Sequence, residues 1–112
     1  MMIRRMRDKD YESVKSLFNE QYDEYLEFLR VNNPRRYARE RRERREVARP
    51  SFDFFVKTES SFVAEIKRKV IGYVISQTIS DVHGMNDALL VEEIAVKAEH
   101  RRQGVATALF QK

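Results

Sequence analysis

The stretch from residue 89 to residue 110 constrains the fold more than any other part of the chain. Residues 89–96 form a strongly apolar run of strand length, and helix-type spacing resumes at Val105 after a short polar loop. Gly104 stands where this helix begins. A buried strand that passes directly into a helix is typical of folds in which helices pack on a sheet.

A long amphipathic helix precedes this stretch. Residues 3–7 alternate like a short first strand, and Asp8 is a suitable N-cap for a helix of about six turns. The apolar residues of this helix recur every three or four positions, as they do on one helix face. We expect the following set to lie in the core: Tyr11, Val14, Leu17, Phe18, Tyr22, Tyr25, Leu26 and Leu29.

An arginine-rich segment follows this helix. Asn33 can cap a second helix and Pro34 suits its first turn, while Pro50 disfavours a helical residue before it. The sequence therefore predicts a helix that ends by Arg49. Eight arginines against three glutamates give residues 34–50 a charge of +5, which leaves −1 for the rest of a chain with net charge +4.

Two interpretations of the arginines stay open. Glu40 with Arg44, and Arg39 with Glu43, have the i,i+4 spacing of stabilising ion pairs, which favours a solvated surface helix. The alternative is a basic surface at residues 35–49 that contacts nucleic acid or an acidic protein.

The next segment predicts a β-hairpin. Residues 60–66 and residues 70–80 have the composition of strands, and Arg68-Lys69 between them fits a tight turn. Gly72 lies inside the second strand, where a glycine often marks a bulge or a close approach of another backbone.

The remaining segments complete the order of elements. Ser51 can cap a short helix through Lys57, with a strand as the alternative, and residues 81–87 form a polar loop. The predicted order is β-α-α-(short α)-β-β-β-α, a mixed α/β (α+β) fold in a single domain, residues 1–112.

Composition excludes several classes of protein. The absence of cysteine excludes disulfides, thiol catalysis and cysteine-based zinc sites, and His83 and His100 lie too far apart in sequence to suggest a metal site. No apolar run approaches the roughly 20 residues of a membrane span. The N-terminus is too charged for a signal peptide. We therefore expect a cytoplasmic protein with no metal and no membrane contact.

The loop after the apolar strand predicts a site for phosphate. The first N–H groups of a helix lack internal partners and carry partial positive charge. Gly104 lets the backbone approach a ligand closely, Ala106 keeps the first turn small, and Arg101 and Arg102 add full charges beside it. Together these features favour an anionic phosphate group.

This stretch resembles motif A of the GNAT superfamily of acetyltransferases. The family signature is Gln/Arg-x-x-Gly-x-Gly/Ala after a strand that often reads Ile-Ala-Val. Here residues 101–106 read Arg-Arg-Gln-Gly-Val-Ala, and residues 94–96 read Ile-Ala-Val. The resemblance implies a GNAT-like acyl-CoA N-acyltransferase fold. It also implies an acetyl-CoA-dependent N-acetyltransferase whose acceptor is a primary amine of a protein or small molecule.

The resemblance also implies roles for individual residues. Acetyl-CoA would serve as cosubstrate, with Arg101 beside its phosphates. Its pantetheine arm would pair with the backbone of Ile94, Ala95 and Val96. Backbone amides along the loop and first helical turn would hold its pyrophosphate, namely those of Arg102, Gln103, Gly104, Val105, Ala106 and Thr107.

The carboxylates Glu92 and Glu93 precede this site. In several GNAT members a glutamate two residues before the Ile-Ala-Val equivalent accepts the amine proton, and Glu92 matches that position. Glu93 is expected to face the other side of the strand. The alternative is that both only line an open groove. We interpret His83 and His100 as structural.

The chain departs from the family pattern at its end. It stops eight residues after Gly104, whereas the resemblance implies a further strand and a helix with a tyrosine that acts as general acid. We therefore expect a C-terminally truncated fold, or a second chain such as a homodimer partner that pairs along the open strand edge. A different class remains as the alternative: a non-catalytic module that binds acetyl-CoA, or nucleic acid through residues 34–49.

Overall fold

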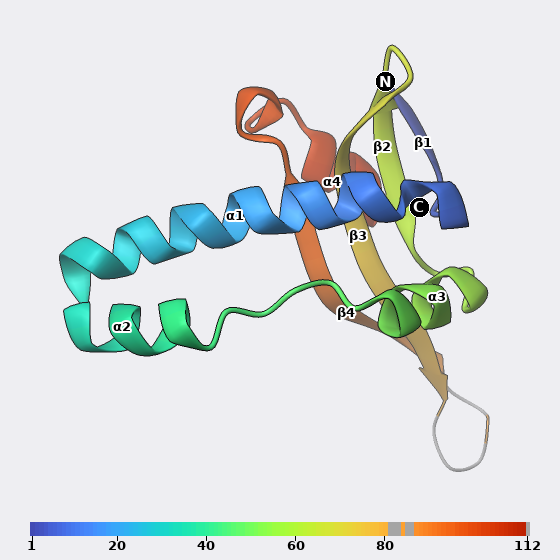
Figure 1. Ribbon diagram of the computed structural model, residues 1–112. Helices are drawn as coiled ribbons and strands as arrows, with labels where there is room; N and C mark the ends of the chain where they lie inside the picture. Colours follow the sequence, from blue (N-terminus) through green and yellow to red (C-terminus); the bar gives the residue numbers. More distant parts are fainter. Residues whose placement is uncertain (81–83, 85–86, 112) are drawn as a thin grey trace.

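The protein folds around one four-stranded antiparallel sheet. The structure, a computed structural model, describes residues 1–80, 84 and 87–111 (Figure 1). Strands lie in chain order across the sheet. They are β1 (Met2–Arg5), β2 (Phe62–Ile66), β3 (Lys69–Ser80) and β4 (Asp87–Val96).

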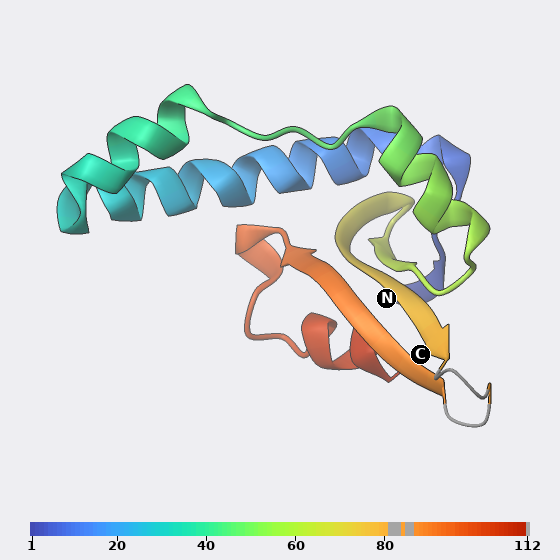
Figure 2. The same cartoon turned by 90° about the horizontal axis from the view of Figure 1, so that it is seen from below.

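Helices cover both faces of this sheet. One face carries α1 (Tyr11–Asn32) and α3 (Arg49–Lys57), and the opposite face carries α4 (Val105–Phe110). Figure 2 shows these three layers, with α2 (Pro34–Arg42) beside the far half of α1. The predicted order of elements and the mixed fold class are therefore confirmed.

Strand alternation divides the core in two. Successive residues of a strand point to opposite faces. Tyr73, Ile75 and Ala95 therefore pack against Val14 and Phe52 on the α1/α3 face. On the α4 face, Val105 and Leu109 pack against a separate set of strand residues, Ala64, Ile71 and Val74.

Helix α1 is as long as predicted, but its aromatic residues are less buried than expected. Val14, Leu17, Leu26 and Leu29 are buried, whereas all four aromatic residues of the predicted set are only half-buried. The far half of α1 projects beyond the sheet and packs along α2 instead (Figure 1). Tyr22, which bonds to Glu40 of α2, and Tyr25 lie on this part of the helix, with Phe18 beside Tyr22, and part of each ring stays in solvent. Tyr11, in the first turn, packs against Phe52 of the core, as predicted.

The predicted second helix is wrong beyond Arg42. It begins at Pro34 with an Asn33 cap, as expected, but residues 44–48 are extended and α3 starts at Arg49 rather than Ser51. The predicted ion pairs of Glu40 with Arg44 and of Arg39 with Glu43 give way to others.

Tertiary contacts explain the extended segment. Arg44 bonds to Asp23 at 2.5 Å and lies 5.0 Å over the ring of Tyr22. The carbonyl of Val47 accepts a hydrogen bond of 2.8 Å from the Tyr11 hydroxyl, and Val47 packs on the core. These contacts hold residues 44–48 against α1 and outweigh the helical preference of the sequence.

Some predicted boundaries shift by one or two residues. The first strand is Met2–Arg5 rather than residues 3–7, and Asp8 starts a short 3-10 turn before α1 instead of capping it. The hairpin turn is Lys67-Arg68, one residue earlier than predicted. Most of the predicted loop at residues 81–87, including His83 and Asn86, lies outside the described residues.

Both predictions for Gly72 are confirmed. The β2–β3 pairing skips Ile71, which is a bulge next to the glycine. A Cβ at Gly72 would lie 3.2 Å from the carbonyl oxygen of Ala95 and 3.2 Å from a methyl group of Val105. Glycine at this position therefore lets α4 seat closely on β3 and β4.

Candidate functional site

A cavity of about 370 Å³ lies where β4 ends and α4 begins. We call it the edge cavity. Its walls bring together every predicted cofactor-binding residue except Gln103. Gln21 from α1 and His100 complete the walls. The predicted residues that meet there are Ile94, Ala95, Val96, Arg101, Arg102, Gly104, Val105, Ala106 and Thr107.

One wall of the edge cavity is the free edge of β4. Within the described chain, β4 is the last strand of the sheet. The Lys97 amide bonds to Ile71 at 2.8 Å, and the direction of backbone groups alternates along an antiparallel strand. Ile94 and Val96 therefore turn their backbone groups toward the cavity, while those of Ala95 face β3. An extended ligand with amide groups can pair with such an edge.

Two side chains already contact these outward carbonyl groups. Gln21 donates to the Ile94 carbonyl at 3.4 Å, and the Arg101 Nε donates to the Val96 carbonyl at 2.9 Å. Both donors confirm that the carbonyl groups point into the edge cavity rather than into the sheet.

The second wall is the loop that leads into α4. Arg102 and Gly104 have positive φ angles of 62° and 78°, which turn successive backbone groups toward one side. Among the described residues, none accepts a hydrogen bond from the backbone N–H groups of residues 102–107. A row of free N–H groups in a concave loop is a site for an anion.

Helix α1 braces this loop from the side. Both terminal nitrogens of Arg101 bond to the carboxylate of Glu24, at 2.5 and 2.8 Å, and Glu20 accepts from the Ala98 amide at 3.2 Å. The hydrogen bond from Arg101 lowers the pKa of Glu24. Arg101 thus positions the loop rather than standing free beside it. Sequence reasoning missed this role, because nothing in the spacing of Glu20, Gln21 and Glu24 shows what their helix face meets.

A second cavity, of about 280 Å³, lies on the α1/α3 face between β4 and residues 45–48. We call it the carboxylate cavity, because both Glu92 and Glu93 line it. Its other walls are mostly apolar and include Phe18, Phe52 and Phe55.

The prediction that Glu93 faces away from Glu92 is wrong. Ile75 pairs with Glu93 and Ser76 with Val91, so Glu92 is an extra residue in a bulge of β4. Gln77, which shares the face of Ile75, donates to Glu92 at 3.2 Å. The bulge therefore turns both carboxylates to one face, as bulges next to active sites often do.

Glu93 is the more buried of the two carboxylates. The hydroxyl of Tyr73, a fully buried residue, donates to it at 2.6 Å. Burial raises the pKa of Glu93, although the hydrogen bond from Tyr73 acts in the opposite direction. Burial and the neighbouring Glu93 together raise the pKa of Tyr73. Glu92 is exposed to solvent in the cavity mouth.

The raised pKa of Glu93 makes a testable contribution to stability. Above the pKa of an unfolded glutamate, about 4.3, the folded state keeps this proton longer than the unfolded state does. Its contribution is therefore fully present below that pH and is lost as pH rises. In urea titrations between about pH 4 and pH 8, Glu93→Gln should gain stability relative to wild type as pH rises. Tyr73→Phe removes the hydrogen bond that lowers the pKa of Glu93, so its stability should fall more steeply with rising pH than that of wild type. Parallel curves of stability against pH for all three proteins would contradict this assignment.

The sheet order and the edge cavity together define the GNAT acyl-CoA N-acyltransferase fold. Solved structures that share it include an acetyltransferase from Vibrio fischeri, with 22% identity, a TM-score of 0.62, and 99% of this chain and 81% of that chain covered. A wild-type protein from Thermus thermophilus has 19% identity and a TM-score of 0.62 over 99% of this chain and 65% of that one. An aminoglycoside N-acetyltransferase in complex with CoA has 18% identity and a TM-score of 0.59 over 98% and 65%.

The chain belongs to the family described as "Protein of unknown function (DUF1999)", whose model matches residues 1–112. No curated protein matches it in sequence. The chain spans about 65% of the length of the Thermus thermophilus structures and of the CoA complex.

No helix in the described ranges is long and apolar enough to cross a membrane. In the same ranges, no three histidine, cysteine, aspartate or glutamate side chains are grouped so as to hold a metal ion.

Proposed function

We propose that this protein is an acetyl-CoA-dependent N-acetyltransferase that acts on a primary amine. One observation carries the proposal: an open strand edge and a row of free backbone amides meet in the edge cavity. A ligand that carries both an amide-containing arm and a diphosphate matches these two walls. Acetyl-CoA is such a ligand, and it supplies an acetyl group activated as a thioester.

The residues present fit acetyl-CoA. The amides of residues 102–107 would hold the diphosphate, and among the described residues no acidic side chain lines the edge cavity to oppose it. The outward backbone groups of Ile94 and Val96 would pair with the pantetheine arm, and Ala95 lines the cavity between them. Arg101, bonded to Glu24 and Val96, would keep the strand and loop in register.

The carboxylate cavity fits the amine. It lies on the α1/α3 face of the same strand and combines apolar walls with three acidic residues, Glu46, Glu92 and Glu93, against one cationic residue, Arg45. Glu92, exposed and oriented by Gln77, would accept the proton of the attacking amine directly or through water. Glu93, bonded to Tyr73, would form the floor of the cavity and attract the ammonium form of the acceptor.

Replacing Glu92 tests its proposed role. Glu92→Gln removes the base but keeps the size and the hydrogen bond to Gln77, so we expect kcat to fall about 10²–10³-fold with unchanged affinity for acetyl-CoA. Glu99→Gln, an exposed change outside both cavities, is the matched control. If kcat is unchanged in Glu92→Gln, a group other than Glu92 is the general base.

Transfer itself is measured by release of free CoA thiol from acetyl-CoA. The acceptor panel should include peptides with free N-termini, lysine side chains and small amines, with mass spectrometry of each product. We expect one class of acceptor to gain 42 Da through an amide bond, about the mass of an acetyl group replacing a proton. If acetyl-CoA binds but no amine is acetylated, the chain is a non-catalytic acetyl-CoA-binding module, which is the alternative proposal.

The other finer predictions stay proposals. A homodimer could cover the edge of β4, since open strand edges invite pairing. Nucleic acid could contact the exposed arginines of residues 35–49, although Arg36, Arg44 and Arg49 already pair with acids of this chain. A cytoplasmic location rests on composition.

A further inference from the structure

A third cavity, of about 560 Å³, lies at the end of the sheet nearest the start of α1. We call it the basic cavity. It shares no lining residue with the edge cavity or the carboxylate cavity. Five of its side chains are cationic, namely Arg4, Lys9, Arg68, Lys69 and Lys97, against two acidic ones, Asp10 and Glu65.

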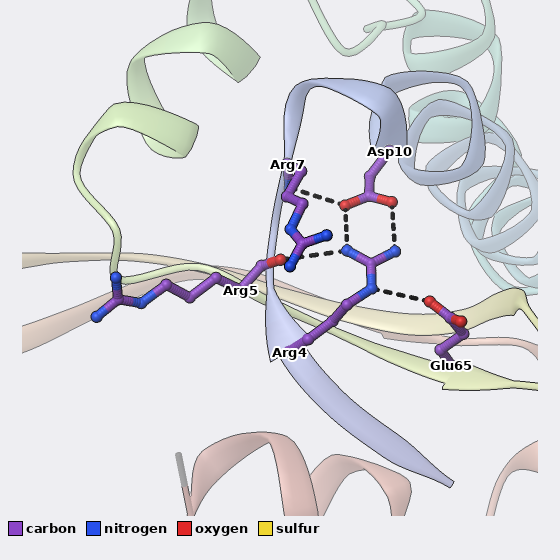
Figure 3. Close-up of polar contacts among 5 residues, drawn as sticks. All are labelled: Arg4, Arg5, Arg7, Asp10 and Glu65. Carbon is purple, nitrogen blue, oxygen red and sulfur yellow. Dashed lines mark hydrogen bonds and ion pairs between the residues drawn. The ribbon is translucent and has the colours of Figure 1, made fainter.

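Both acidic side chains bond to one arginine, whose single positive charge offsets one of their two negative charges. Figure 3 shows Arg4 between them: it bonds to both oxygens of Asp10, at 2.8 and 2.9 Å, and to Glu65 at 2.8 Å. The Arg7 amide donates a third bond to Asp10, at 2.8 Å. This network forms one side of the cavity, where five cationic side chains against two carboxylates leave a side-chain charge of +3.

The charges around the four remaining cations do not cancel them. Lys97 lies 3.7 Å from Glu99, and these side chains are 42% and 70% exposed. Glu12 and Glu20 line the neighbouring groove that Lys97 also borders. No ion pair within the described ranges involves Lys9, Arg68 or Lys69. The cavity therefore keeps a surplus of positive charge on three different elements, with the Ser13 hydroxyl as a further donor.

The hairpin turn beside this cavity has an unfavourable backbone. Lys67 and Arg68 adopt φ angles of 50° and 67°, a left-handed conformation that Asn-Gly adopts with little strain and bulky side chains do not. The strained pair brings the guanidinium of Arg68 to the cavity wall. A two-residue hairpin turn favours positive φ at both central residues, so the turn itself fixes this conformation and the position of Arg68.

We propose that the basic cavity binds a compact anion with two or more phosphate groups. Lys9, Arg68, Lys69 and Lys97 surround the space from separate elements, which suits several spread charges better than a single carboxylate. The site is independent of the acetyl-CoA site proposed above, because the two cavities have no residue in common.

Pyrophosphate is the probe, and amide chemical shifts of the full chain report where it binds. We expect saturable shifts at residues 9, 13, 68–70 and 97, weaker binding of orthophosphate, and the same shifts when acetyl-CoA is in excess. Shifts confined to residues 102–107, or no saturable shift, would overturn the proposal.

Substitution of the turn separates binding from folding. Lys67→Asn with Arg68→Gly should relax the backbone and raise Tm by several degrees, while weakening pyrophosphate binding at least tenfold. Lys9→Gln should weaken binding without touching the turn, and Lys57→Gln, an exposed lysine outside the cavity, should leave it unchanged. Wild-type affinity in both cavity variants would contradict the assignment.

Discussion

Replacing Asp10 by alanine should lower the free energy of unfolding by about 3–5 kcal/mol, the usual effect of removing one partner from a buried ion pair. The side chains of Asp10 and Arg4 are only 3% and 11% exposed. Burial alone would raise the pKa of Asp10, but bonds from Arg4 and the Arg7 amide outweigh it and lower the pKa. Without Asp10, the Arg4 guanidinium keeps only Glu65 as an acidic partner (Figure 3).

The control and the pH dependence sharpen this test. Asp8→Ala removes an exposed pair with Arg49 and should have a much smaller effect in the same urea titration. Because the pKa of Asp10 is lowered in the folded state, its contribution is present above about pH 4 and is lost as pH falls through the folded pKa. The difference between wild type and Asp10→Ala should therefore shrink in acid. Equal effects of Asp8→Ala and Asp10→Ala would contradict the role of this network.

Replacing Gly104 by valine should weaken acetyl-CoA binding about a hundredfold, with little change in overall fold. Gly104 has φ of 78°, where a β-branched side chain is strained, so the backbone must move and take the neighbouring amides with it. Each hydrogen bond to a charged group contributes about 1.5–3 kcal/mol, and 1.4 kcal/mol is tenfold in affinity. Loss of one or two phosphate contacts thus accounts for the expected change, which isothermal titration measures.

Gly84 provides a matched control for this substitution. It also has a positive φ, of 67°, and a Cβ there would meet nothing within 4 Å. Gly84→Val introduces similar backbone strain away from the edge cavity, so it should reduce stability without changing acetyl-CoA affinity. If both valine variants bind acetyl-CoA as wild type does, the loop at residues 102–107 does not hold the diphosphate.

Periodicity and turn chemistry were enough to predict much of the fold. The spacing of apolar residues gave the length of α1, and the run before Val96 gave β4, because both elements bury a regular face. Gly104 and the resemblance at residues 101–106 led to the edge cavity, since a glycine at a helix start leaves a local signature that does not depend on distant contacts.

Distant contacts explain what the sequence did not reveal. Residues 44–48 have helical composition but are extended, because Asp23 and Tyr11 hold Arg44 and Val47 from a segment more than twenty residues away. The single-residue bulge at Glu92 depends on the pairing of β3 with β4, so strict alternation placed Glu92 and Glu93 on opposite faces. Gln21 reaches the edge cavity only because α1 crosses the sheet there.

The central claim is that the strand edge and the loop bind acetyl-CoA together. An amide chemical-shift titration of the full chain with acetyl-CoA tests it most directly, because it reports both affinity and location. The account predicts saturable shifts that cluster at residues 94–96 and 102–107 and that are lost in Gly104→Val. Absence of saturable shifts, or shifts that cluster on the arginines of α2 or in the basic cavity instead, would contradict it.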